Sequence, residues 1–175
     1  MFVESRLKFY KEHYPESPSY RLEQFERAFF TPGIRSVEAM TTLSKTERET
    51  LKDLPWLTFP ETLILTSKKQ DTFKAIVTLH DGKKIETVLM QNRREHWTVC
   101  VSSQEGCAMA CTFCATGTMG FTRNLTVDEI VDQYRLWVMY LEDRPELAPR
   151  ITNIVFMGMG EPLANYQNVK TTIET

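Results

Sequence analysis

The chain has 175 residues, of which 42% are hydrophobic and 25% are charged, and its formal net charge is −2. This composition is ordinary for a soluble globular protein, and it lacks the strongly basic balance typical of nucleic-acid-binding domains, although a local basic patch is compatible with it. No apolar run approaches the roughly 18 residues that span a membrane. The first residues lack the apolar core of a signal peptide. We therefore expect a cytoplasmic protein that does not contact a membrane.

Residues 1–57 form the first of three zones and have a helical pattern. Arg21–Phe30 is predicted to be an amphipathic helix. Its apolar face holds Leu22, Phe25, Phe29 and Phe30. Ser44–Glu47 is a capping-box sequence that predicts the start of a short helix, with Leu51 and Leu54 on its apolar side. We interpret this zone as a small helical accessory domain.

Residues 58–92 change to a strand pattern. Thr72–Leu79 and Lys84–Met90 are both rich in residues that favour strands, and an Asp-Gly pair lies between them. This arrangement predicts a β-hairpin with the Asp-Gly pair in its turn. We interpret the zone as a hairpin segment that joins the core, and we predict a further strand at Trp97–Val101.

Residues 93–175 follow the order strand, cysteine loop, helix, strand, loop, helix. Leu125–Glu129 caps a long amphipathic helix that runs to about Glu142. Its apolar face includes Ile130, Tyr134, Trp137, Val138 and Leu141. Ile151–Met157 is a short continuous apolar run, typical of a buried parallel strand, and a last helix starts at Asn165.

This order predicts an α/β fold built from two successive βα units. Two such units neither close a barrel nor cover both faces of a parallel sheet. We therefore expect the zone to be the first part of a longer α/β core.

Three cysteines lie within eight residues, at Cys107, Cys111 and Cys114, with the spacing C-x3-C-x2-C. Cubane iron–sulfur clusters usually take four cysteine ligands, so three thiolates would leave one iron open for chemistry. A zinc site is one alternative, and it would need a fourth ligand such as Cys100 or His96. The other alternative is three thiols without a metal. Phe113 lies between two of the cysteines, where it would shield a cluster from water or pack in the core.

The segment Gly158–Pro162 reads Gly-Met-Gly-Glu-Pro and follows the predicted strand at Ile151–Met157. Ligands of α/β folds bind at the carboxyl ends of the strands, so Gly160 and Glu161 are in the right place for a cofactor. Glycine allows close backbone approach, and Glu161 can accept a hydrogen bond from an ammonium group. Taken alone, however, a glycine-rich strand end is more often a turn.

Glu86 and Cys100 lie in predicted strands, and each has two interpretations. Glu86 is either a solvated residue or, if it faces a cavity, a general base. Cys100 is either a small buried hydrophobe or a reactive thiol.

Three basic pairs, Lys68–Lys69, Lys83–Lys84 and Arg93–Arg94, are interpreted as solvated surface, with a phosphate contact as the alternative.

Three segments resemble the RlmN/Cfr branch of radical SAM enzymes. They are residues 100–117, 124–133 and 155–163, which read CVSSQEGCAMACTFCATG, NLTVDEIVDQ and VFMGMGEPL. The resemblance implies a partial (βα)6 barrel that carries a 4Fe–4S cluster on Cys107, Cys111 and Cys114. It also implies that S-adenosylmethionine (SAM) binds the open iron and that Gly160 and Glu161 hold its amino-acid end.

The resemblance further implies how this branch methylates RNA. Reductive cleavage of SAM gives a 5′-deoxyadenosyl radical, which abstracts hydrogen from a methyl group on a second cysteine. The methylene radical adds to adenine, Glu86 accepts the adenine proton, and Cys100 resolves the adduct by forming a disulfide.

The implied partners are RNA and an external reductant such as flavodoxin or ferredoxin, and the implied state is a monomer. RlmN enzymes modify carbon 2 of adenosine in 23S rRNA and tRNA, and Cfr relatives modify carbon 8 in the ribosomal RNA.

The sequence departs from this branch in four respects. Its only cysteines are Cys100, Cys107, Cys111 and Cys114, so none is left to carry the methyl group, and the later serine and asparagine contacts to the cofactor are missing. The spacing from Glu86 to Cys100 is one residue longer than in the branch, and Glu105 stands where the branch usually has an apolar residue. We expect that this chain alone does not methylate RNA. Two alternatives remain open: a radical SAM enzyme for a small molecule or peptide, and a non-catalytic zinc-binding RNA module.

Overall fold

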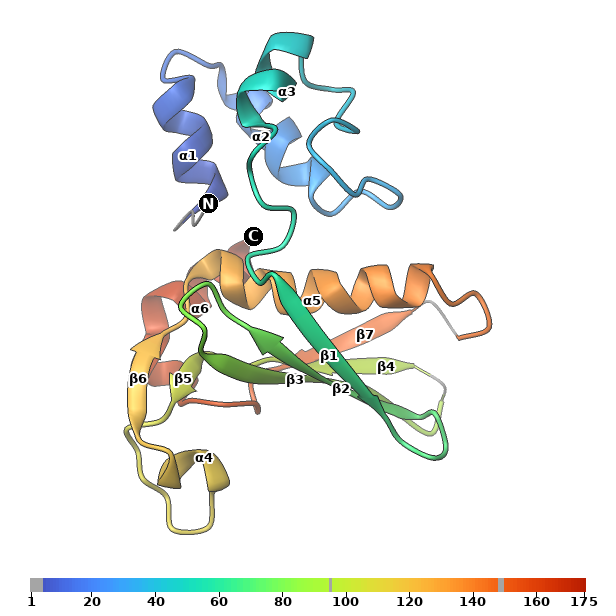
Figure 1. Cartoon of the computed structure of the whole chain (residues 1–175), viewed down its shortest axis with the longest axis vertical. Helices are drawn as coiled ribbons and strands as arrows, with labels where there is room; N and C mark the ends of the chain where they lie inside the picture. Colours follow the sequence, from blue (N-terminus) through green and yellow to red (C-terminus); the bar gives the residue numbers. More distant parts are fainter. Residues whose placement is uncertain (1–4, 95, 148–149) are drawn as a thin grey trace. The chain divides into compact units, whose positions relative to one another are not determined.

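The structure is a computed structural model that describes residues 5–94, 96–147 and 150–175. It divides into two compact units, the first ending at Thr58 and the second spanning Phe59–Thr175. Each unit has its own secondary structure (Figure 1).

The first unit is helical, as predicted. Its helices are α1 (Arg6–His13), α2 (Ser19–Ala28) and α3 (Lys45–Leu51). The predicted capping box is present, since the Ser44 hydroxyl accepts from the Glu47 N–H and the Glu47 carboxylate accepts from the Ser44 N–H. Phe30 was expected on the apolar face of α2, but it is 38% exposed because α2 ends before it.

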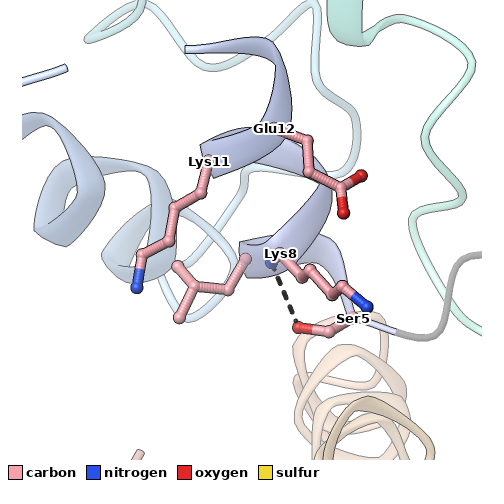
Figure 2. Close-up of a pocket in the computed structure, with 5 residues that line it drawn as sticks. Ser5, Lys8, Lys11 and Glu12 are labelled. Atoms are coloured by element: carbon pink, nitrogen blue, oxygen red, sulfur yellow. Dashed lines mark hydrogen bonds between the residues drawn. The ribbon is translucent and has the colours of Figure 1, made fainter. Parts of the chain in front are cut away.

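Apolar side chains from all three helices form the core of this unit. The fully or almost fully buried members are Tyr10, Phe25, Ala28, Val37, Met40, Leu43 and Leu51. An open surface pocket of about 400 Å³ also belongs to this unit, and it is lined by Ser5, Leu7, Lys8, Lys11 and Glu12 (Figure 2). In it the Ser5 hydroxyl accepts a hydrogen bond from the Lys8 N–H and caps α1.

The second unit is built on a five-stranded sheet. Its strands are β1 (Glu61–Thr66), β2 (Thr72–Thr78), β3 (Lys84–Gln91), β4 (Trp97–Cys100) and β7 (Ile151–Val155), arranged in that order. The first four strands pair antiparallel, and β4 pairs parallel with β7. The predicted hairpin is confirmed as β2–β3, and Gly82 in its turn has the positive φ of 77° that favours glycine. Strand β1 was not predicted.

Helix α5 (Val127–Glu142) covers one face of this sheet (Figure 1). Alternate residues of β2 and β3 point to this face and are buried. They are Phe73, Ala75, Val77, Ile85, Thr87 and Leu89. Trp137 of α5 packs on them and donates from its indole nitrogen to the Thr87 hydroxyl at 3.1 Å. A capping box of Thr126 and Glu129 starts the helix.

Strand β7 corrects one prediction. It is parallel to β4 as expected, but it is not buried, because it forms the edge of the sheet. Ile154 is 48% exposed there. The predicted last helix is α6 (Tyr166–Glu174), preceded by the short 3-10 helix η1 (Pro162–Asn165).

The chain between β4 and α5 forms a small second sheet that was not predicted. It consists of β5 (Gln104–Gly106) and β6 (Phe121–Asn124), and the loop between them carries the cysteines and the short helix α4 (Ala115–Thr118). Within the described part of the chain, no helix has the length and apolar character needed to cross a membrane.

Candidate metal and cofactor site

The cysteine loop is closed at its base by two glycines. The N–H of Cys107 donates to the carbonyl oxygen of Gly120 at 2.8 Å. Gly106 has a φ of 75°, and a Cβ atom there would lie only 1.9 Å from the same carbonyl oxygen. Only glycine therefore lets the two ends of the loop meet, and the cysteines are held on a closed hairpin loop.

The three thiols of the loop differ in exposure and acidity. All are free; Cys107 is buried, Cys111 is exposed and Cys114 lies between these extremes. Cys114 is the N-cap of α4, and the backbone of Gly117, followed by that of Thr116, forms hydrogen bonds that hold the pKa of the Cys114 thiol below its ordinary value. A thiol that ionises more readily is a better metal ligand.

The donor set fits an iron–sulfur cluster in its chemistry. Three soft sulfur ligands lie on one short loop, and a glycine at position 117 lets the loop turn back on itself, since a Cβ atom there would lie 3.0 Å from the backbone of Cys111. Among the described residues, however, no three His, Cys, Asp or Glu side chains converge on one metal position. The described residues therefore do not form the zinc site that Cys100 or His96 would complete.

Phe113 is 91% exposed, so the core-packing interpretation of this residue is wrong. Its ring stands on the cysteine loop between Cys111 and Cys114, where shielding of a bound cluster is the remaining interpretation.

The Gly-Met-Gly-Glu turn is hydrogen-bonded to the segment that leads into the cysteine loop. The carbonyl oxygen of Met159 accepts from the N–H groups of Ser103 and Gln104, at 2.8 and 3.2 Å. In return, the Met159 N–H donates to the Ser102 hydroxyl at 2.8 Å, and the Glu161 N–H donates to the Gln104 amide oxygen at 2.9 Å. The turn after β7 and the start of the cysteine loop are therefore one connected structure.

Both glycines of this turn are needed for that contact. A Cβ atom at Gly158 would lie 2.7 Å from the Ser102 hydroxyl oxygen, and one at Gly160 would lie 2.5 Å from the Cβ atom of Gln104. Gly160 also has a φ of 92°. Both glycines therefore allow close packing against residues 101–104, and the approach of a cofactor to Gly160 stays a prediction.

Glu161 lies half-buried at the end of this turn. Its carboxylate accepts from the Leu163 N–H at 3.2 Å and caps η1. This bond directs the side chain toward the start of η1.

Buried side-chain amides that sequence reasoning did not select hold residues 102–104 in place. Gln133 of α5 forms a pair of hydrogen bonds with the backbone of Ser102, at 2.8 and 3.0 Å. Asn165 donates to the carbonyl oxygens of Ser103 and Leu125, at 2.8 and 2.9 Å. The sequence offers one sign of this contact: Gln133 is a polar residue three positions after Ile130, on the predicted apolar face of the helix.

An ion-pair network ties β6 to the rest of the unit. Arg123 donates to Asp81 in the β2–β3 turn at 2.7 Å and makes two bonds of 2.8 Å to the fully buried carboxylate of Glu129. Hydrogen bonding to Glu129 is the largest of the effects that raise the pKa of Arg123. His80 lies 3.4 Å from the same carboxylate.

Glu86 and Cys100 lie on the same face of the large sheet, opposite α5. Cys100 pairs with Val88, which is two residues from Glu86 in β3, and paired or alternate residues share a face. Glu86 is 46% exposed and forms an ion pair with Lys74 at 2.9 Å, which matches its interpretation as a solvated residue. Cys100 is buried, and burial raises the pKa of its thiol.

No protein-family model matches the chain. Among solved structures, a radical SAM methyltransferase from Sphaerobacter thermophilus superimposes with a TM-score of 0.81 and 37% sequence identity, covering 99% of this chain and 51% of that one. The chain thus has the fold of part of a radical SAM methyltransferase.

Comparison with curated sequences is more specific. The chain is 46% identical over 163 residues to a probable dual-specificity RNA methyltransferase RlmN of Chlorobium phaeobacteroides, covering 90% of this chain and 44% of the relative. It is 43% identical over 157 residues to the RlmN of Oleidesulfovibrio alaskensis, covering 89% and 43%. The resemblance to the RlmN family is therefore confirmed, and the chain spans less than half the length of these relatives.

Proposed function

We propose that this chain forms the cluster- and cofactor-binding part of a radical SAM methyltransferase that modifies carbon 2 of adenosine in 23S rRNA and tRNA. The observation that carries the proposal is the hydrogen-bonded contact between Met159 and residues 103–104. This contact places the glycine-rich turn beside the segment that leads directly to Cys107. The similarity to RlmN relatives supports the same reaction.

Each half of this site has a defined role. Cys107, Cys111 and Cys114 would hold a 4Fe–4S cluster, and Gly160 and Glu161 would bind the amino-acid end of SAM. When bound, the cluster and SAM supply the one-electron chemistry that activates a methyl group. The Glu161 carboxylate suits an ammonium group, and Gly160 allows the turn that carries Glu161 to pack against Gln104.

Cys100 and Glu86 are the proposed catalytic residues, and they share the face of the sheet opposite α5. Burial raises the pKa of the Cys100 thiol and so lowers its intrinsic reactivity, and the catalytic role of Cys100 is proposed from the similarity to RlmN relatives. Glu86 would accept the adenine proton. A disulfide of Cys100 would need a further cysteine, because the other three cysteines of this chain are assigned to the cluster.

The wider assignments rest on the same similarity. The order β4, α5, β7, α6 and the parallel pairing of β4 with β7 support about two βα units of a partial (βα)6 barrel in residues 93–175. A hairpin segment (58–92) and a helical accessory domain (1–57) precede this core. RNA is the proposed substrate, and flavodoxin or ferredoxin the proposed reductant. The proposed state is a cytoplasmic monomer.

Anaerobic reconstitution of the chain with iron and sulfide tests the cluster. We expect a brown protein with about four irons per chain. Cys111→Ala should abolish the bound iron, and Cys100→Ala, the matched control, should retain it. A colourless protein that binds one zinc ion with equal loss in both variants would overturn the proposal and favour a zinc module.

The reaction itself is tested in a longer protein that carries this segment and a further cysteine. Nucleoside analysis of the RNA product separates carbon 2 from carbon 8 methylation. A methylated peptide or small molecule, with unmodified RNA, would contradict the assignment to RNA.

A further inference from the structure

One end of the large sheet gathers basic side chains that the proposed chemistry does not use. The β1–β2 turn, the β3–β4 turn and the residue before β7 all lie at this end, because Thr66, Thr72, Gln91, Trp97 and Ile151 mark it in the strand register. We call it the basic end, and it consists of Lys68, Lys69, Arg93, Arg94 and Arg150.

These turns are joined to one another by backbone hydrogen bonds. The N–H of Gln91 donates to the carbonyl oxygen of Asp71 at 2.8 Å, and the N–H of Trp97 donates to that of Arg150 at 3.0 Å. The basic end is therefore a preformed surface. It lies at the opposite end of the sheet from β5, β6 and the cysteine loop (Figure 1).

The five cations of the basic end are exposed, and none is in an ion pair with a described carboxylate. Lys69 is near enough to Asp71 to contribute to the lowered pKa of that carboxyl group. This distinguishes them from Lys74 and Arg123 of the same unit, which are held in ion pairs. The nearest described carboxylate in sequence, Asp71, is bonded to the hydroxyls of Ser67 and Thr72. The chain has a net charge of −2, so this end is a local concentration of positive charge on an otherwise slightly acidic protein.

We propose that the basic end binds the phosphate backbone of RNA at a distance from the cysteine loop, an inference that rests on the proposed RNA substrate. Guanidinium groups match phosphate geometry, and lysines add unpaired positive charge. The described residues of the two turns include no Phe, Tyr or Trp, and the His96 ring is half-buried, so we assign the contact to phosphates, without base preference. They also expose no apolar side chain that would enter a lipid bilayer, which favours RNA over a membrane surface.

The test measures binding of the 175-residue chain to a fluorescein-labelled RNA stem-loop by anisotropy, between about 0.05 and 0.3 M NaCl. Each phosphate contact contributes about 0.7–0.9 to the slope of log affinity against log salt. Lys68→Gln with Lys69→Gln, and Arg93→Gln with Arg94→Gln, should each weaken binding about tenfold at 0.1 M NaCl and reduce the slope by about 1.5.

Lys45→Gln with Lys52→Gln on α3 is the matched control, because it removes two exposed lysines from the other unit. It should change the affinity less than twofold, and all variants should keep the parent unfolding temperature. Equal losses in control and test variants, or no binding of RNA, would overturn the proposal. Tighter binding of phosphatidylserine vesicles than of RNA, lost in the same test variants, would assign the surface to a membrane.

These measurements need neither cluster nor methylation. A chain that fails to assemble a cluster and still shows the predicted salt slopes would contradict the proposed function and support the basic end. A chain that assembles the cluster, but whose test variants bind RNA with the parent salt slope, would support the proposed function and contradict the basic end.

Discussion

Replacing Arg123 with Gln tests whether the ion-pair network holds the cysteine hairpin in place. The substitution removes two bonds of 2.8 Å to Glu129, whose carboxylate is fully buried, and one bond of 2.7 Å to Asp81. Removing one partner of a buried pair costs about 3–5 kcal/mol, since the other charge stays buried. The Arg123 side chain is 25% exposed, so water moderates this cost, and we expect a loss of about 2–4 kcal/mol.

Urea unfolding followed by tryptophan fluorescence measures this loss. Trp97 and Trp137 are fully buried in the second unit, and a Trp56→Phe background removes the tryptophan of the first. Lys74→Gln is the matched control, because it removes a cation from an exposed pair worth less than about 1 kcal/mol. If Arg123→Gln and the control cost the same, the network does not stabilise the hairpin and the reasoning is refuted.

Three further predictions concern the site itself. Alkylation followed by mass spectrometry should label Cys114 at lower pH than an ordinary thiol and Cys100 only at higher pH. Hydrogen bonds lower the pKa of the Cys114 thiol, and burial raises the pKa of the Cys100 thiol. Labelling in the reverse order would contradict both assignments. Gly160→Ala should lower the free energy of unfolding in urea by about 2–4 kcal/mol, because a Cβ atom is disfavoured at a φ of 92° and would clash with the Gln104 side chain. Gly82→Ala, which has open space around it, should lower it by about 1 kcal/mol. Glu105→Val should raise the free energy of unfolding by about 1–2 kcal/mol, because one oxygen of this buried carboxylate has no hydrogen-bond partner among the described residues. A loss of stability would show that the Glu105 carboxylate makes a favourable interaction in the folded protein.

Local signals in the sequence predicted much of this fold. The capping boxes at Ser44 and Thr126 depend only on residues three positions apart, and the β2–β3 hairpin depends on alternation and an Asp-Gly turn. Whether β7 is buried could not be predicted from such local signals. A run of apolar residues favours a strand, but the neighbours of that strand are set by the order of strands in the sheet, and β7 is at the edge.

In the candidate site, too, local features were predicted from the sequence and long-range contacts were not. The cysteine spacing is local and indicated the loop correctly, but β5 and β6 have three and four residues and are too short to show a period. The amides of Gln133 and Asn165 meet residues 102–103 across 31 and 62 positions of sequence. The position of Gln133 on the apolar face of its helix indicates a buried polar contact, but only the fold determines that Ser102 is the partner.

Residues 102–104 are the point at which the two halves of the proposed site depend on each other. Their backbone receives the glycine-rich turn through Met159, and the same segment continues through Gly106 into the cysteine loop. The side chain of Gln104 bonds both the Glu161 N–H and the Asn124 amide of β6. A change at Gln104 would therefore displace the proposed SAM contacts and the cysteine hairpin together, whereas a change at Cys111 would affect the metal alone.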